Sequence, residues 1–164
     1  TLILGCGVPL ASAFGIVDYC RVGPDVSLIF DDVWFMKFMH RERISTKITL
    51  QNTINRYYIN GIGFNNDPDV YIMRKENVKL NELQKEALII INFIFGSIYM
   101  TSDNIANYDA SKKELMQKYQ QFKYHKVISI TYGKKYINFV TEFNENKYNF
   151  SYDTKKGVLS YGKI

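Results

Sequence analysis

The spacing of hydrophobic and polar residues changes near residue 120. Before this point, short continuous apolar runs alternate with longer segments of helical spacing, and beyond it apolar and polar residues alternate. Continuous apolar runs are typical of strands buried in a parallel sheet, whereas alternation is typical of antiparallel strands with one exposed face. The pattern therefore predicts an α/β part over residues 1–119 and a small antiparallel β domain over residues 120–164.

Three strands are expected in the first part. Residues 2–6 form an apolar run closed by a glycine and a proline, which predicts a strand buried on both faces. Residues 18–22 form a second run, which ends at a Gly-Pro pair. The chain is strand-like again after residue 63, but the polar segment 65–69 interrupts it before residues 70–74.

Helical spacing predicts helices between and after these strands. Residues 45–58 keep a roughly helical period, and Asn81 followed by Gln84 resembles a capping box. The helix that this box opens runs to about Phe95, and its all-round apolarity predicts burial. Two shorter helices are expected, one over 34–39 capped by Asp31 or Asp32 and one from Ser111 to about Tyr119. Strands that alternate with helices indicate β/α units around a parallel sheet.

The second part contains four alternating segments separated by turn residues. They lie at residues 127–132, 136–143, 147–152 and 158–161. Short alternating segments joined by Gly- and Asn-containing turns are typical of an antiparallel sheet.

Composition indicates an ordinary globular chain. The 164 residues are 46% hydrophobic and 23% charged, which is enough for one sizeable core. The net charge is only +5, and the 21 Lys and Arg form no block of five or six. A solvated basic surface is therefore favoured over a nucleic-acid partner.

The sequence predicts neither a metal site nor a cofactor. Cys6 and Cys20 are too few for a disulfide framework and lie in no metal-ligand spacing, so we expect reduced, buried thiols. His40 and His125 are far apart in sequence, and no GxSxG motif marks a nucleophilic serine.

The chain gives no sign of a membrane span or a signal peptide. Its most hydrophobic segment, residues 87–100, is interrupted by polar residues and is shorter than the roughly 20 apolar residues that a span needs. Thr1 opens inside an apolar run, without a basic region or a cleavage site. We therefore expect a piece of a longer chain, without a membrane partner, and favour a cytoplasmic over a secreted location.

Candidate chemistry begins at Asp25, which follows the second expected strand. Arg21 precedes it by four residues, and the Gly23-Pro24 corner between them turns the chain sharply. A carboxylate on a stiff turn suits a general acid, because proton delivery needs a fixed position. The alternative is that Asp25 caps the following segment.

Two other motifs leave functional and structural alternatives open. Asp67 and Asp69 flank a proline, and their carboxylates suit a cation, a sugar hydroxyl or, as the favoured structural alternative, backbone N–H groups or an arginine. Cys6 lies between two glycines, which suits either close approach of a ligand or a tight turn beneath a core thiol.

Four motifs in order carry a resemblance to a known family. They are LGCGVPL at 4–10, GIVDYCRVGPDV at 15–26, NDPD at 66–69 and YMTSD at 99–103. Together they resemble the carboxyl-terminal third of retaining α-galactosidases of the melibiase type, glycoside hydrolase family 36 and the related family 27. The resemblance covers residues 1 to about 109, and the later strands resemble the family's C-terminal β domain.

The resemblance implies a fold and an activity. Residues 1–119 are expected to form the last β/α units of a (β/α)₈ barrel, and residues 120–164 a small antiparallel β-sandwich. The implied activity is hydrolysis of terminal α-D-galactosides by retaining double displacement. The rival interpretation is a non-catalytic carbohydrate-binding or structural β module.

The resemblance also implies roles for individual residues. Asp25 aligns with the general acid/base, and Arg21 with an arginine that contacts both the sugar and the catalytic carboxylate. Cys6 aligns with a cysteine that lines the galactose pocket. Asp67 and Asp69 align with residues that support the pocket floor.

One family feature has no counterpart in the sequence. The nucleophile of the family lies in a Lys-x-Asp motif on an earlier strand, and no such motif precedes Asp25 here. We therefore expect a fragment that is inactive by itself. A parallel sheet without its neighbouring strands exposes an edge and an apolar face, so self-association is also expected.

Overall fold

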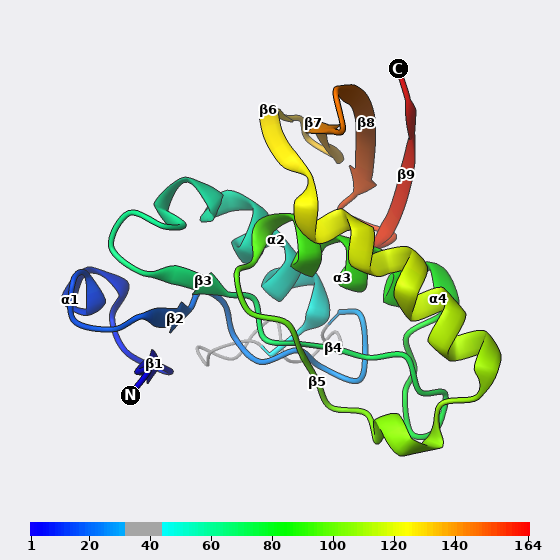
Figure 1. Cartoon of the computed structure of the whole chain (residues 1–164), viewed down its shortest axis with the longest axis horizontal. Helices are drawn as coiled ribbons and strands as arrows, with labels where there is room; N and C mark the ends of the chain where they lie inside the picture. Colours follow the sequence, from blue (N-terminus) through cyan, green and yellow to red (C-terminus); the bar gives the residue numbers. More distant parts are fainter. Residues whose placement is uncertain (32–43) are drawn as a thin grey trace.

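A computed structural model describes residues 1–31 and 44–164 of the chain. Short parallel strands lie on one side of the central helices and an antiparallel sheet lies on the other (Figure 1). The short helix expected at 34–39 lies outside the described residues.

Five short strands confirm the parallel pairing predicted for the first part. β1 (Leu4–Gly5), β2 (Tyr19–Arg21) and β3 (Asn65–Asp67) form one sheet in that order, and β4 (Val70–Tyr71) pairs with β5 (Met100–Thr101). The register sets Gly5 beside Cys20 and Arg21 beside Asp67. This register brings the carboxyl ends of β2 and β3 together.

Several strand predictions were wrong in extent. β1 is shorter than residues 2–6, and the expected burial on both faces is not seen, since Leu2 is 74%, Ile3 51% and Leu4 40% exposed. Within the described residues, β1 is the edge strand of its sheet. The segment 65–69 was expected to interrupt a strand, but its first three residues form β3. The two-residue strand β5 was not predicted.

The two main helices form where sequence signals begin them. α2 (Thr46–Asn55) starts after Ser45, whose hydroxyl accepts a hydrogen bond from the Ile48 N–H, and ends earlier than residue 58. α3 (Glu82–Phe95) has the predicted capping box and the predicted burial. The remaining helical segments are α1 (Leu10–Ala13), η2 (Tyr57–Ile59), η3 (Ile105–Asn107), α4 (Ala110–Gln120) and η4 (Gln121–Tyr124).

The start predicted for α4 was wrong by one residue. Asp109 caps this helix by accepting a hydrogen bond from the Lys112 N–H at 2.7 Å, so Ser111 lies within the first turn. A carboxylate is favoured at a helix N-terminus both as a hydrogen-bond acceptor and by its charge.

The second part forms the predicted four-stranded antiparallel sheet. Its strands are β6 (Lys126–Tyr132), β7 (Tyr136–Phe143), β8 (Asn146–Asp153) and β9 (Val158–Lys163), paired in chain order. One face is buried, with Phe139 and Phe150 stacked at 4.8 Å between ring centroids. Within the described residues this is a single sheet, so the second layer that a sandwich needs is not seen.

α3 links the two parts through one hydrophobic core. Its apolar residues pack with Leu50 and Ile54 of α2 and with Phe139, Phe150 and other residues of the antiparallel sheet. A smaller cluster of Ala13, Cys20, Val22 and Phe64 includes Cys20 of β2. The domain boundary at residue 120 stays a prediction, and the main core extends across it.

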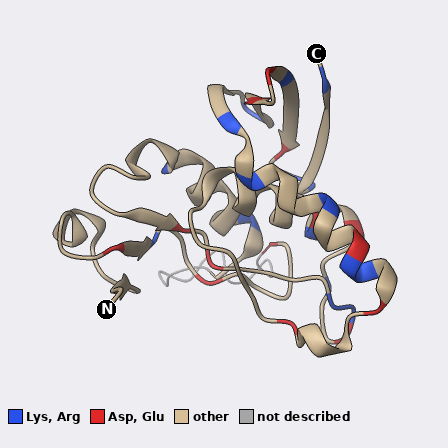
Figure 2. Ribbon diagram, viewed as in Figure 1, with Lys and Arg blue, Asp and Glu red and all other residues tan. Residues whose placement is uncertain are grey.

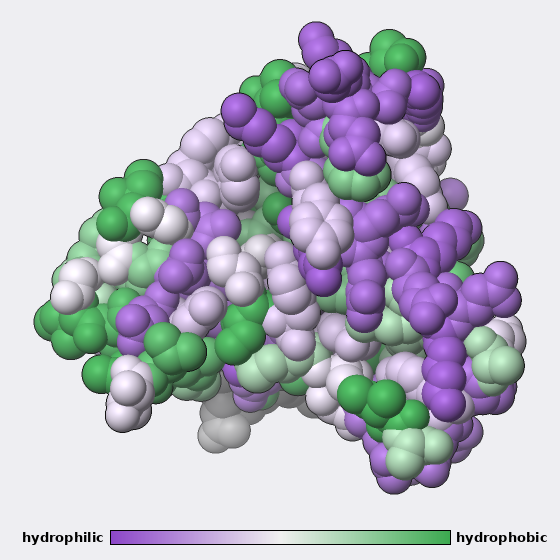
Figure 3. Space-filling model, in the orientation of Figure 1, coloured by the Kyte–Doolittle hydropathy of each residue, from purple (hydrophilic) through white to green (hydrophobic). Residues whose placement is uncertain are grey.

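The surface is polar over much of the chain. Lys and Arg are spread along α4 and the antiparallel sheet in the view of Figure 2. Apolar side chains are more prominent near the N-terminus (Figure 3). No helix within the described residues is long and apolar enough to cross a membrane.

Candidate active site

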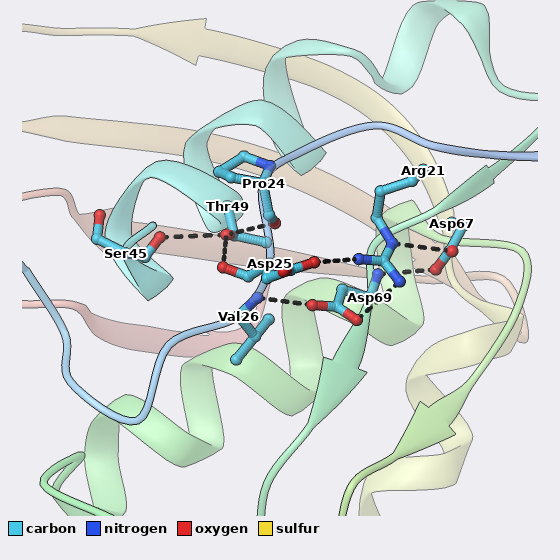
Figure 4. A network of polar contacts seen from close by, with 8 residues as sticks. All are labelled: Arg21, Pro24, Asp25, Val26, Ser45, Thr49, Asp67 and Asp69. Carbon is cyan, nitrogen blue, oxygen red and sulfur yellow. Dashed lines mark hydrogen bonds and ion pairs between the residues drawn. The ribbon is translucent and has the colours of Figure 1, made fainter. Parts of the chain in front are cut away.

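Arg21 lies at the centre of a cluster of three carboxylates (Figure 4). Its Nη1 is 3.0 Å from Asp25 Oδ1, its Nε is 3.0 Å from Asp67 Oδ2, and its Nη2 is 3.0 Å from Asp69 Oδ1. A guanidinium suits this arrangement because its planar fork presents several donors in fixed directions. The structure therefore brings together four of the five residues selected from the sequence.

Asp67 and Asp69 are buried and hold the backbone in place. Asp67 Oδ1 accepts a hydrogen bond from the Asp69 N–H at 2.8 Å, and Asp69 Oδ2 accepts one from the Val26 N–H at 2.6 Å. Asp69 has a φ of 73°, which is uncommon for a residue other than glycine. Asp67 and Asp69 therefore make the contacts that the favoured structural alternative predicted from the sequence, to an arginine and to backbone N–H groups.

Burial and charge act in opposite directions on this cluster. Burial raises the pKa of Asp69 above its ordinary value, and the bond from Val26 and the charge of Arg21 only partly offset this. Burial alone would lower the pKa of Arg21, but the carboxylates of Asp67 and Asp69 outweigh it and the pKa is raised. Arg21 therefore stays charged and continues to organise the cluster.

Asp25 differs from the other two carboxylates because it is open to solvent. Its side chain is 69% exposed, whereas that of Asp67 is fully buried. It lies on the loop that follows a parallel strand, and it contacts the Arg21 side chain. The alternative role of Asp25, capping of the segment that follows it, does not account for this contact. A fixed carboxylate that solvent and ligand can reach can accept or deliver a proton.

Cys6 lies next to this cluster, at the end of β1. Its thiol is exposed, so the expectation of two buried thiols was wrong for Cys6 and confirmed for Cys20. Burial raises the pKa of the Cys20 thiol, and the charges of Asp67 and Cys6 add to this. Cys6 directly follows β1, which is the edge strand of this sheet in the part of the chain that the structure describes.

An open hollow of about 370 Å³ adjoins Arg21 on the loop side of β1 and β2. Its lining is Gly7, Val8, Pro9, Leu10, Arg21, Gly23, Pro24, Asn52 and Arg56. Within the described part of the chain, no group of three or more His, Cys, Asp and Glu side chains is arranged to hold a metal ion.

Sequence reasoning missed the contribution of α2 to this site. Thr46, Thr49 and Thr53 are fully buried, and the first two bond the loop that carries Asp25. Three threonines on the buried face of one helix are an unusual pattern, because threonine has a modest helix propensity. The three threonines were therefore the feature of the sequence that could have indicated the contribution of α2 to the site.

Comparisons with known proteins show what this architecture is similar to. No protein-family model matches the sequence. An α-galactosidase from Thermus thermophilus in complex with p-nitrophenyl α-D-galactopyranoside superposes with a TM-score of 0.67 over 89% of this chain, at 20% identity. The chain has an α-galactosidase-like fold. It spans 29% of the length of that enzyme.

Two further structures give the same result. The Thermus thermophilus enzyme in complex with stachyose gives a TM-score of 0.63 at 23% identity, over 72% of this chain and 26% of that one. α-Galactosidase I from Mortierella vinacea gives 0.60 at 13% identity, over 84% of this chain and 38% of that one. At these identities the likeness concerns the fold.

Proposed function

We propose that this chain is the part of a retaining α-galactosidase that carries the general acid/base, and that Asp25 is that residue. The observation that carries the proposal is the exposed Asp25 carboxylate, held by Arg21 beyond a parallel strand of an α-galactosidase-like fold. In this role Asp25 protonates the departing glycosidic oxygen and then takes a proton from the attacking water. The substrate class is terminal α-galactosides.

Arg21 and Cys6 are proposed to contact the sugar. The Arg21 side chain is 13% exposed, so its partly open edge is available to a hydroxyl while its bonds to three carboxylates fix its direction. Cys6 is exposed at the end of the neighbouring strand. Asp67 and Asp69 support Arg21 through its Nε and Nη2.

The nucleophile is proposed to lie outside this chain. A retaining glycosidase needs a second carboxylate about 5–5.5 Å from the acid/base, free to attack the sugar. Asp67 and Asp69 do not suit this role, because both are buried and engaged by Arg21 and by backbone N–H groups. The short parallel strands are accordingly assigned to the last part of a (β/α)₈ barrel, and residues 120–164 to a C-terminal β domain.

The proposal predicts that the purified 164-residue chain releases no nitrophenol from p-nitrophenyl α-galactoside. Methyl α-galactoside is nevertheless expected to shift the NMR signals of Arg21, Asp25 and Cys6 more than methyl α-glucoside does. Turnover by the pure chain would refute the missing nucleophile. The proposed site would be refuted if both sugars shifted the NMR signals equally and the shifted signals belonged to other residues.

We also propose that the isolated chain associates with itself through the N-terminal apolar patch, defined as Leu2, Ile3, Phe14, Ile16 and Ile62. All five side chains are exposed. Their segments adjoin one another, since the Gly15 N–H donates to the Gly63 carbonyl and the Ile3 carbonyl accepts from the Asp18 N–H. An apolar surface beside an open strand edge favours contact with a second copy.

A further inference from the structure

Helix α2 bonds the backbone on both sides of Asp25. Thr49 Oγ1 lies 3.0 Å from the Pro24 carbonyl oxygen and 3.2 Å from that of Asp25 (Figure 4). Further along the loop, the Thr46 hydroxyl donates to the Ser27 carbonyl at 2.7 Å. At the other end of the helix, Arg56 donates to the Val22 carbonyl.

The Thr49 hydroxyl lies within hydrogen-bond distance of two loop carbonyls and of one carbonyl of its own helix. It has a single proton, and its third neighbour, the Ser45 carbonyl oxygen at 3.1 Å, already accepts a hydrogen bond from the Thr49 N–H. Donation to the Pro24 or Asp25 carbonyl therefore satisfies a group that the helix does not. Since Thr49 is fully buried, water does not compete for this proton.

We propose that Thr49 is a positioning residue for Asp25, an inference that rests on the acid/base role proposed above. The loop is fixed on one side by Thr49 and on the other by the bond from the Val26 N–H to Asp69. Between these points, Asp25 is 69% exposed, so its ion pair with Arg21 orients the carboxylate but contributes little to holding the loop. The backbone bonds thus fix the position from which the Asp25 side chain reaches Arg21.

Three variants of the 164-residue chain separate positioning from simple loss of a buried hydroxyl. Thr49→Val keeps the shape and removes the donor, and Thr49→Ser restores a hydroxyl. Thr53→Val is the matched control, because Thr53 is also fully buried in α2 but its hydroxyl donates to the Thr49 carbonyl of the same helix.

Native-state amide exchange at Val26 is the deciding measurement, corrected for the free energy of global unfolding of each variant. Thr49→Val is expected to speed this exchange about five- to tenfold relative to Thr53→Val, the effect of one lost hydrogen bond. Thr49→Ser is expected to restore slow exchange. Equal exchange in Thr49→Val and Thr53→Val would overturn the proposal.

A second measurement links positioning to catalysis. In a polypeptide that joins this chain to a barrel segment with the nucleophile, Thr49→Val is expected to lower kcat with little change in KM, and Thr49→Ser to recover it. An unchanged kcat in Thr49→Val would count against positioning. Because the exchange experiment needs no hydrolysis, failure of the acid/base role is detected separately, by full activity in Asp25→Asn.

Discussion

At the scale of single residues, the sequence indicated the roles of Arg21 and Asp25 more clearly than those of the buried Asp67 and Asp69. Arg21 and Asp25 are four positions apart around a Gly-Pro corner, and the family resemblance implied the contact that the structure has between them. The contacts of Arg21 with Asp67 and Asp69 depend on the register of β2 against β3. No local pattern encodes that register, so the sequence left alternatives for both aspartates.

The cluster predicts unequal losses of stability for the same substitution at two of its aspartates. Asp67→Asn removes the charge of the fully buried partner of Arg21 and is expected to lower the free energy of unfolding by about 2–3 kcal/mol. Asp25→Asn removes an exposed contact and is expected to cost less than about 1 kcal/mol. Urea unfolding of both variants measures the difference, and equal losses would contradict the division into support and chemistry.

At the scale of elements, helices with clear caps and long alternating strands could be predicted from the sequence. α3 has its capping box, and the four antiparallel strands lie within a few residues of the expected ranges. The two-residue strand β5 and the four-residue helix α1 are too short to show a period. Their formation depends on neighbours that only the tertiary structure provides.

The corrected start of α4 can be tested directly. Asp109→Ala removes the side chain that caps the helix and is expected to lower the free energy of unfolding by about 1 kcal/mol. Ser111→Ala, the matched control, is expected to have little effect because Ser111 lies inside the first turn. Thermal unfolding compares the two variants. A larger loss of stability for Ser111→Ala than for Asp109→Ala would instead support the helix start at Ser111 that was predicted from the sequence.

A buried histidine just before the first strand of the antiparallel sheet makes the stability of the chain depend on pH. Burial lowers the pKa of His125 below its ordinary value of 6.5, and its Nδ1 lies 2.7 Å from Thr141 Oγ1. As the pH falls, His125 therefore binds a proton in the unfolded chain before it does so in the folded chain. The contribution of neutral His125 to the free energy of unfolding is present above pH 6.5 and is lost as the pH falls below it.

We expect the free energy of unfolding of the native chain to fall faster below about pH 6.5 than that of His125→Asn. His40 is common to both proteins, so their difference reports His125. Denaturant unfolding at a series of pH values measures this difference, and parallel pH profiles would show that His125 is not the cause.

At the scale of the whole molecule, four sequence motifs in order suggested the α-galactosidase-like fold, whereas the order of elements indicated only β/α units. What it did not show is the common core: α3 packs against both α2 and the antiparallel sheet, so the change of pattern near residue 120 is not a break in packing. Within the described residues, α3 packs against the apolar face of the antiparallel sheet.

The N-terminal apolar patch predicts association in solution. Ile16 is 71% and Ile62 75% exposed, and replacing both by lysine is expected to convert a self-associating chain into a monomer. Leu83→Lys is the control, because Leu83 is an exposed apolar residue of α3 away from the patch. Sedimentation velocity distinguishes the species. A monomeric wild-type chain would rule the association out.

The acid/base role of Asp25 is tested most directly by the leaving-group dependence of hydrolysis. The assay uses a polypeptide that joins this chain to a barrel segment with the nucleophile. Asp25→Asn is expected to lower kcat/KM by about 10²–10⁴ for methyl α-galactoside, whose leaving group needs a proton. The loss should be much smaller for the first step with p-nitrophenyl α-galactoside. Undiminished hydrolysis of methyl α-galactoside by Asp25→Asn would contradict the account.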